Sequence, residues 1–200
     1  MARAAPLSPA ERRASLLAAA REVFAERGYH GASVADILTA AGVARGTFYN
    51  HFESKRDVFA AVLAELMGQI VGVIRPIDVQ RPVIEQVHEN LRLIARGMAE
   101  AGDAVRILFT DAQSVDGEGE AALGAFYAVA LDRVERALAA GQGLGLVRVG
   151  ETRQTARCLL GLLKEPVMQA RLAHEPLDAE ALADAIFALL RGGVLVDQER

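Results

Sequence analysis

Residues 42–55 read GVARGTFYNHFESK, and this stretch decides the fold. A glycine at position 42 can adopt the positive φ that a tight turn between two helices needs. After it, Val43 and Phe48 are spaced to anchor a short helix against its neighbours. The remaining residues of this helix are Arg45, Gly46, Thr47, Tyr49, Asn50 and His51. All of them except Gly46, which has no side chain, carry a hydrogen-bond donor. The pattern predicts a helix-turn-helix whose second helix, at about residues 44–51, presents a polar face outward.

Helix signals flank this stretch on both sides. Ser8 with Glu11 and Ser33 with Asp36 are capping-box patterns, in which a hydroxyl and an acid three residues later satisfy the first amides of a helix. Ser54 begins a third pattern of this kind. Together with the glycines at 28 and 42 and the proline at 76, they predict helices over about residues 8–28, 33–42 and 54–75.

Beyond residue 76, apolar residues recur with helical spacing to the end of the chain. We expect helices over about 83–102, 103–112, 120–140, 152–173 and 178–194, an interruption at Gly117 and Gly119, and a loop over 141–150. The sequence therefore predicts an all-α protein of about nine helices. Its expected parts are a three-helix helix-turn-helix domain at 1–53, a linking helix at 54–75 and a larger C-terminal helical bundle at 76–200.

Composition narrows the class of protein. The chain has 200 residues, a formal net charge of −4 and one cysteine, Cys158, so an internal disulfide and a Cys-rich zinc site are excluded. No apolar run approaches the length of a membrane span, and we expect a cytoplasmic protein. Residues 1–56 carry a net charge of +3 and residues 57–200 a net charge of −7, which indicates that the first part alone approaches a polyanion.

The donor-rich helix indicates double-stranded DNA as a partner. Arg side chains bind guanine and Asn side chains bind adenine in the major groove, while Tyr, Thr and His donate to phosphates. Two residues at the starts of the flanking helices, Ser33 and Lys55, are placed to bind phosphates on either side. Each residue taken alone also has an explanation without DNA. Ser33 can be a helix cap, Tyr49 and His51 can be packing residues, and Lys55 can be a solvated charge.

The segment resembles the N-terminal DNA-binding domain of the TetR family of bacterial transcriptional regulators. The resemblance covers residues 8–67 and is carried by Ile37, Ala41, Gly42, Val43, Gly46, Thr47, Tyr49, Phe52 and Lys55. It implies that Arg45 and Thr47 face base edges or nearby phosphates, that Gly46 admits the backbone, that Asn50 reads a base, and that Tyr49, His51 and Lys55 hold phosphates. The chain departs from the family pattern at Leu38, Ala44 and His51, which weakens any inference about the operator sequence.

The C-terminal part shows no catalytic constellation. Its histidines are widely separated, and we expect no enzyme activity, no metal and no cofactor. Bulky and polar residues there predict a small-molecule pocket: His88, Arg106, Phe109, Thr110, Gln113, Phe126, Tyr127, Cys158 and Met168. The alternative is that these residues form ordinary core and solvated surface.

The last two predicted helices are apolar over a broad face, which predicts a homodimer interface. The expected interface residues are Leu159, Leu163, Val167, Leu182, Ile186 and Leu190. The alternative is a monomer that buries both helices internally. The resemblance implies a repressor that is released from a palindromic operator by a small-molecule effector. A DNA-binding dimer without a ligand, or a helical enzyme whose helix-turn-helix only packs, remains as a rival.

Overall fold

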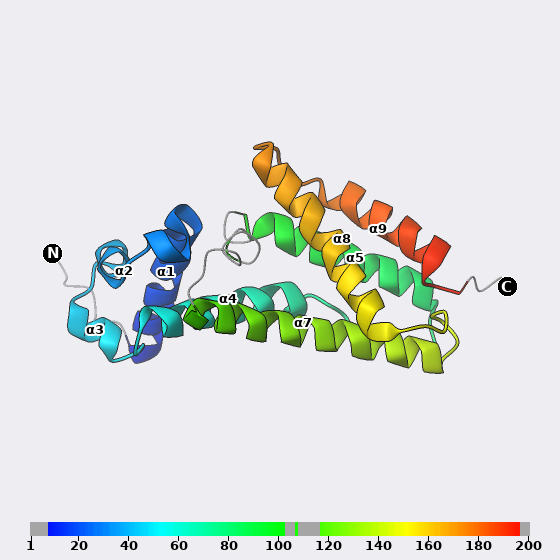
Figure 1. Ribbon diagram of the computed structural model, residues 1–200, viewed down its shortest axis with the longest axis horizontal. Coiled ribbons are helices and arrows are strands. Elements are labelled where there is room, and N and C mark those ends of the chain that lie inside the picture. The colour runs from blue at the N-terminus through cyan, green and yellow to red at the C-terminus, as the bar shows by residue number, and fades with distance from the viewer. Residues whose placement is uncertain (1–7, 103–106, 108–116, 197–200) are drawn as a thin grey trace. The chain divides into compact units, whose positions relative to one another are not determined.

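The computed structural model describes residues 8–102, 107 and 117–196, and its regular structure in these ranges is helical (Figure 1). The prediction of an all-α protein is confirmed. The helix expected over 103–112 lies outside the described residues apart from Ile107, which is buried. None of the helices in the described ranges is long and apolar enough to span a bilayer. The helices are α1 (Pro9–Gly31), α2 (Val34–Ala41), α3 (Arg45–Tyr49), α4 (Lys55–Gly72), α5 (Val83–Glu100), α7 (Gly117–Gly143), α8 (Thr152–Leu172) and α9 (Ala179–Gly193).

The chain divides into two compact units. One consists of Met1–Leu66 and Asp103–Gly124, and the other of Met67–Gly102 and Ala125–Arg200. Two helices, α4 and α7, begin in the first unit and end in the second.

The first unit contains α1, α2, α3 and the first parts of α4 and α7, and an aromatic cluster packs between α1 and α4. Phe24, Tyr29 and Phe59 pack with ring centroids 4.7–6.0 Å apart, and all three are buried. The capping boxes predicted at Ser8 and Ser33 both form. The chain breaks from helical geometry at Gly28, where φ is 71°, and adds one more helical turn before α1 ends at Gly31.

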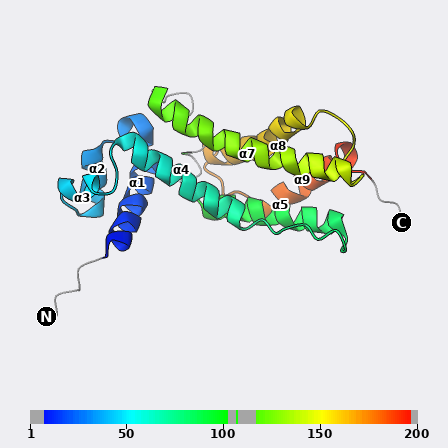
Figure 2. The same cartoon turned by 90° about the horizontal axis from the view of Figure 1, so that it is seen from below.

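In the second unit α9 packs along α5, and α8 contacts α9 (Figures 1 and 2). The apolar residues of α9 that face inward are Leu182, Ala183, Ile186 and Leu190. A short antiparallel bridge joins Val147, after α7, to Leu195, after α9. Its hydrogen bonds run from Arg148 N to Val194 O at 2.8 Å and from Val196 N to Leu146 O at 3.0 Å.

The expected boundaries of α7 are wrong. Gly117 and Gly119, expected to interrupt the helix, lie within it, and so do Gly141 and Gly143, expected in the following loop. A glycine costs a helix about 1 kcal/mol relative to alanine, which a packed helix of this length tolerates. At Gly141 there is a specific reason for glycine: a Cβ there would lie 2.5 Å from Cγ2 of Val147.

Candidate nucleic-acid interface

A left-handed glycine makes the turn between α2 and α3. Gly42 has φ 64° and ψ 32°, a conformation that other residues adopt only with strain. Its N–H donates to Thr39 O at 3.3 Å, and the next N–H, of Val43, donates to Leu38 O at 3.2 Å. These bonds close the end of α2 and turn the chain directly into α3, as the sequence predicts.

A single residue anchors α3 in the core. Phe48 is fully buried and packs against Phe52, with ring centroids 5.7 Å apart. The helix has one regular turn, and its N-cap, Ala44, makes no side-chain hydrogen bond. Within α3, therefore, the burial of Phe48 provides most of what holds the helix in place.

The other residues predicted to contact DNA on α3 and just after it face outward or are half-buried. Arg45, Gly46 and Asn50 are exposed, and Tyr49 exposes 47% of its surface although it is a large aromatic residue. Thr47 and His51 are half-buried. No described atom lies within 4 Å of a Cβ built on Gly46, so the backbone there is open to close approach.

Two of these side chains form a stack. The Arg45 guanidinium carbon lies 5.6 Å from the centroid of the Tyr49 ring, and the ring meets the edge of Phe48 at 5.3 Å. Cation–π contact of this kind limits the rotamers of an otherwise mobile side chain. The Arg45 guanidinium is therefore exposed and partly oriented on the outer face of α3.

The two flanking residues predicted to hold phosphates make hydrogen bonds within the chain. The Ser33 hydroxyl donates to a carboxylate oxygen of Asp36 at 2.6 Å and accepts from the Asp36 amide at 3.2 Å. This hydroxyl, together with the Ser33 amide and the Arg27 guanidinium, lowers the pKa of Asp36 below its usual range. A phosphate contact from Ser33 would have to replace the bond to Asp36.

Lys55 is turned toward the end of α1. Its Nζ donates to the carbonyl oxygens of Tyr29 at 2.9 Å and Ala32 at 3.2 Å, and it lies 4.2 Å from the centroid of the Tyr29 ring. The side chain is half-buried. The sequence cannot reveal this arrangement, because the carbonyls that Lys55 binds lie 26 and 23 residues earlier in the chain.

Sequence reasoning missed one cation near α3. Arg13, an exposed residue of α1, places its guanidinium carbon 5.1 Å from the centroid of the Phe52 ring. Phe52 lies three residues after the end of α3, so the guanidinium of Arg13 is held close to the C-terminal end of that helix. No short-range sequence pattern could predict this contact, because it joins residues 39 positions apart.

The structure does not gather the predicted effector residues around one described cavity. Arg106, Phe109, Thr110 and Gln113 lie outside the described residues. Phe126 and Tyr127 on α7 and Met168 on α8 are half-buried, whereas Cys158 is exposed. Burial raises the pKa of Tyr127 to about 12, as expected for a phenol inside a helical bundle.

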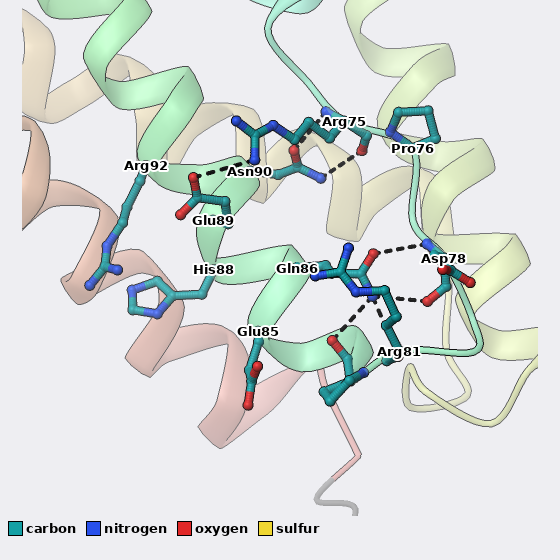
Figure 3. Close-up of a pocket in the computed structure, with 11 residues that line it drawn as sticks. Arg75, Pro76, Asp78, Arg81, Glu85, Gln86, His88, Glu89, Asn90 and Arg92 are labelled. Atoms are coloured by element: carbon teal, nitrogen blue, oxygen red, sulfur yellow. Dashed lines mark hydrogen bonds and ion pairs between the residues drawn. The ribbon is translucent and has the colours of Figure 1, made fainter.

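His88 is the described member of that set that borders a cavity of about 540 Å³, formed by α5 and the chain that precedes it (Figure 3). Its ring stacks on Phe187 with centroids 4.0 Å apart, and its Nε2 lies 2.7 Å from an Asp184 carboxylate oxygen. The pKa of the Asp184 carboxyl is lowered chiefly by this bond from His88 and then by the bond from Arg92. His88 thus serves the packing of α5 on α9 in this structure.

Two amides of α5 hold the connection between α4 and α5 (Figure 3). Asn90, which is buried, accepts from Arg75 N at 2.8 Å and donates to Arg75 O at 2.9 Å. Gln86, one turn earlier, accepts from Asp78 N and donates to the Asp78 carbonyl, both at 2.9 Å. The end of α4 is therefore tied to α5 by side-chain bonds to backbone rather than by apolar packing alone.

The residues predicted for the dimer interface divide into two groups. Val167, Leu182, Ile186 and Leu190 are buried within the single chain, so they are not available to a partner. Leu182, Ile186 and Leu190 are buried because the apolar face of α9 packs against α5. Leu159 and Leu163 are half-buried, while Leu172 at the end of α8 and Leu189 on α9 are exposed to 69% and 59%.

Comparisons with known proteins agree with this geometry. The family model described as bacterial regulatory proteins of the tetR family matches residues 16–62. The transcriptional activator FasR of Mycolicibacterium smegmatis is 45% identical over 65 residues, which are 32% of this chain and 30% of that protein. The fatty acid metabolism regulator of Bacillus subtilis is 26% identical over 182 residues, 90% of this chain and 93% of the relative.

A solved structure extends the likeness over both units. The regulator FadR from Bacillus subtilis, in complex with stearoyl-CoA, has a TM-score of 0.79 and 25% identity, covering 90% of this chain and 98% of that one. The helical order described above is thus shared over 90% of this chain. Residues 16–62 therefore match the bacterial regulatory proteins of the tetR family, and 90% of the chain is similar to regulators that share this helical order.

Proposed function

We propose that this protein is a ligand-responsive repressor that binds a palindromic operator as a homodimer and is released by a small-molecule effector. Residues 1–53 are the DNA-binding domain, 54–75 the linking helix, and 76–200 the effector-binding and dimerisation domain. The observation that carries the proposal is α3, a helix with one buried anchor and an exposed face of donors after a left-handed glycine.

The exposed face of α3 matches the chemistry of a major groove. Arg45 and Asn50 have the donors that read guanine and adenine, and both are exposed. Tyr49 and His51 donate hydrogen bonds to phosphates, and Thr47 contacts base edges or nearby phosphates. Gly46 allows the backbone to approach the duplex, because no described atom fills the space beside it.

Dimerisation would use the sides of α8 and α9 that do not face the chain's own core. Leu172 and Leu189 are largely exposed, and Leu159 and Leu163 are partly so. Pairing these helices with their copies in a second chain would cover this apolar surface. A twofold dimer would then present two α3 helices to a palindromic site.

A long-chain acyl-CoA is the effector class that the relatives support. The regulator solved with stearoyl-CoA aligns with 90% of this chain, and a second alignment of the same extent is with a fatty acid metabolism regulator. Effector binding would act through α4, which runs from the DNA-binding unit into the second unit. A coupling of about 1–3 kcal/mol changes DNA affinity about 5–150-fold.

The first test is DNA binding. The purified full-length chain selects fragments from a random duplex library, and fluorescence anisotropy then measures affinity for the selected fragment. We expect a palindromic consensus. Arg45→Ala should weaken binding at least tenfold, because a bidentate base contact is worth about 1–3 kcal/mol in each half-site. Arg133→Ala, which removes an exposed charge on α7, is the matched control and should bind like the wild type.

The second test is release. Stearoyl-CoA added to the complex should lower the anisotropy, while free CoA should not. Tighter binding with stearoyl-CoA would contradict release as the mechanism. A wild-type protein that selects no DNA sequence would refute the proposal as a whole. No response to any acyl-CoA or to a diverse ligand library would favour the DNA-binding dimer without an effector.

A further inference from the structure

We propose that Arg13, and not Lys55, supplies the cationic phosphate contact beside α3. The inference rests on the DNA binding proposed above. It assigns a DNA contact to a residue outside the helix-turn-helix, and it removes one that the family resemblance implies.

The charge of Lys55 is already in use. Two of the three N–H groups on its ammonium donate to the carbonyls of Tyr29 and Ala32, at the end of α1. The ring of Tyr29 lies 4.2 Å from the same ammonium. Moving Lys55 to a phosphate would leave these carbonyls without the donor and remove the cation from the ring, so its bonds favour the inward position.

Arg13 has the opposite situation. Its side chain is exposed, and no acidic side chain among the described residues forms an ion pair with it. Its guanidinium lies over the face of Phe52, 5.1 Å from the ring centroid. A guanidinium held by its face keeps the N–H groups at its edge available, and these are the groups that bind phosphate oxygens.

The position of Arg13 follows from that of Phe52. Phe52 is buried, its N–H donates to Phe48 O at 2.9 Å, and its ring packs on the Phe48 ring that anchors α3. The cation is thus fixed to the same aromatic pair that fixes α3. We infer that Arg13 binds the phosphate backbone flanking the groove that α3 enters.

The salt dependence of DNA binding separates the two residues. Each cationic phosphate contact contributes about 0.9 to the slope of log affinity against log salt. A palindromic site engages both protomers, so losing one contact per protomer should reduce the slope by about 1.8. Arg13→Gln and Lys55→Gln each remove one positive charge from the same module, so each is the charge-matched control for the other.

We expect Arg13→Gln to reduce the slope by about 1.8 on the selected operator while its thermal midpoint stays at the wild-type value. Lys55→Gln should keep the wild-type slope and lower the thermal midpoint. Arg13→Lys should keep the slope, since a lysine retains the charge. An unchanged slope in Arg13→Gln overturns the inference. This variant alone is decisive if Lys55→Gln does not fold, because Arg13 is an exposed side chain.

The outcomes also separate this inference from the proposal on which it rests. If the wild type binds a selected operator and Arg13→Gln leaves the slope unchanged, DNA binding stands and the assignment of Arg13 fails. If the slope falls in Lys55→Gln instead, the phosphate contact belongs to Lys55 and the inward bonds give way on DNA. If the wild type selects no DNA, both proposals fail together.

Discussion

Replacing Gly141 with alanine should destabilise the second unit, although alanine is the better helix former. Gly141 lies in the last turn of α7, and the chain after the helix folds back over it. A Cβ at this position would lie 2.5 Å from Cγ2 and 3.3 Å from Cβ of Val147. Carbon atoms pack without strain at about 3.5–4.0 Å, so the neighbouring atom would have to move by about 1 Å.

Val147 has little freedom to move. Its side chain is β-branched, which restricts χ1, and its backbone N–H donates to Gly141 O at 3.2 Å. The bridge to Leu195 holds it from the other side. Overpacking of this kind costs about 1–3 kcal/mol. Alanine in a helix recovers about 1 kcal/mol relative to glycine, so the expected net loss is about 0–2 kcal/mol.

Urea unfolding followed by circular dichroism measures this change. Gly68→Ala is the matched control, because Gly68 is an exposed position in α4 and no described atom lies within 4 Å of its Cβ. It should stabilise the protein by about 0.5–1 kcal/mol, opposite in sign to Gly141→Ala. The double variant Gly141→Ala with Val147→Ala lacks the Cγ2 atom that the new Cβ would approach. The changes in free energy of unfolding of the two single variants should therefore not add. A stabilising Gly141→Ala would refute the argument from close contact.

Three further predictions concern the polar contacts. Asn90→Ala should lower the free energy of unfolding by about 2–3 kcal/mol, since it leaves the amide and carbonyl of Arg75 without their partner; urea unfolding tests this. Ser33→Ala should cost about 1 kcal/mol through the loss of the α2 cap and leave the operator affinity at fixed salt unchanged. Asp184 has a pKa below its usual range because His88 and then Arg92 bind it, so its stabilising contribution is present above about pH 4 and disappears as the pH falls through the lowered pKa. Asp184→Asn should therefore be less stable than the wild type at pH 7, and thermal melts should show the difference shrinking in acid.

Each of these predictions has a clear contrary result. An Asn90→Ala variant no less stable than Asn50→Ala, which changes an exposed amide, would show that the Arg75 bonds contribute nothing. A lower operator affinity of Ser33→Ala at fixed salt would place that hydroxyl on DNA after all. A stability difference for Asp184→Asn that stays constant from neutral to acid pH would contradict the role of the carboxylate.

Local features of the fold could be predicted from the sequence. The caps at Ser8 and Ser33 and the left-handed turn at Gly42 depend on residues within four positions of each other, and all three are present as predicted. The buried position of Phe48 follows from the same short-range pattern. The family resemblance rests on this segment and is confirmed by the comparisons.

Contacts between distant residues could not be predicted. The inward bonds of Lys55 and the ring contact of Arg13 depend on how α1 packs against the end of α3 and the start of α4, which no spacing rule describes. The end of α7 was missed because a glycine favours a loop locally, whereas Gly141 is needed here for a tertiary contact with Val147. The apolar face of α9 was recognised, but periodicity alone does not say that α5 covers it.

The attachment of α3 through Phe48 has an evolutionary consequence. Because no other residue of this helix is fully buried, substitutions at Arg45, Gly46 and Tyr49 should change the free energy of unfolding very little. Duplicated copies of the gene can therefore diverge in operator preference without compensating changes in the hydrophobic core. The same property makes these positions suitable for a combinatorial library, in which most members should remain folded and differ in the DNA that they bind.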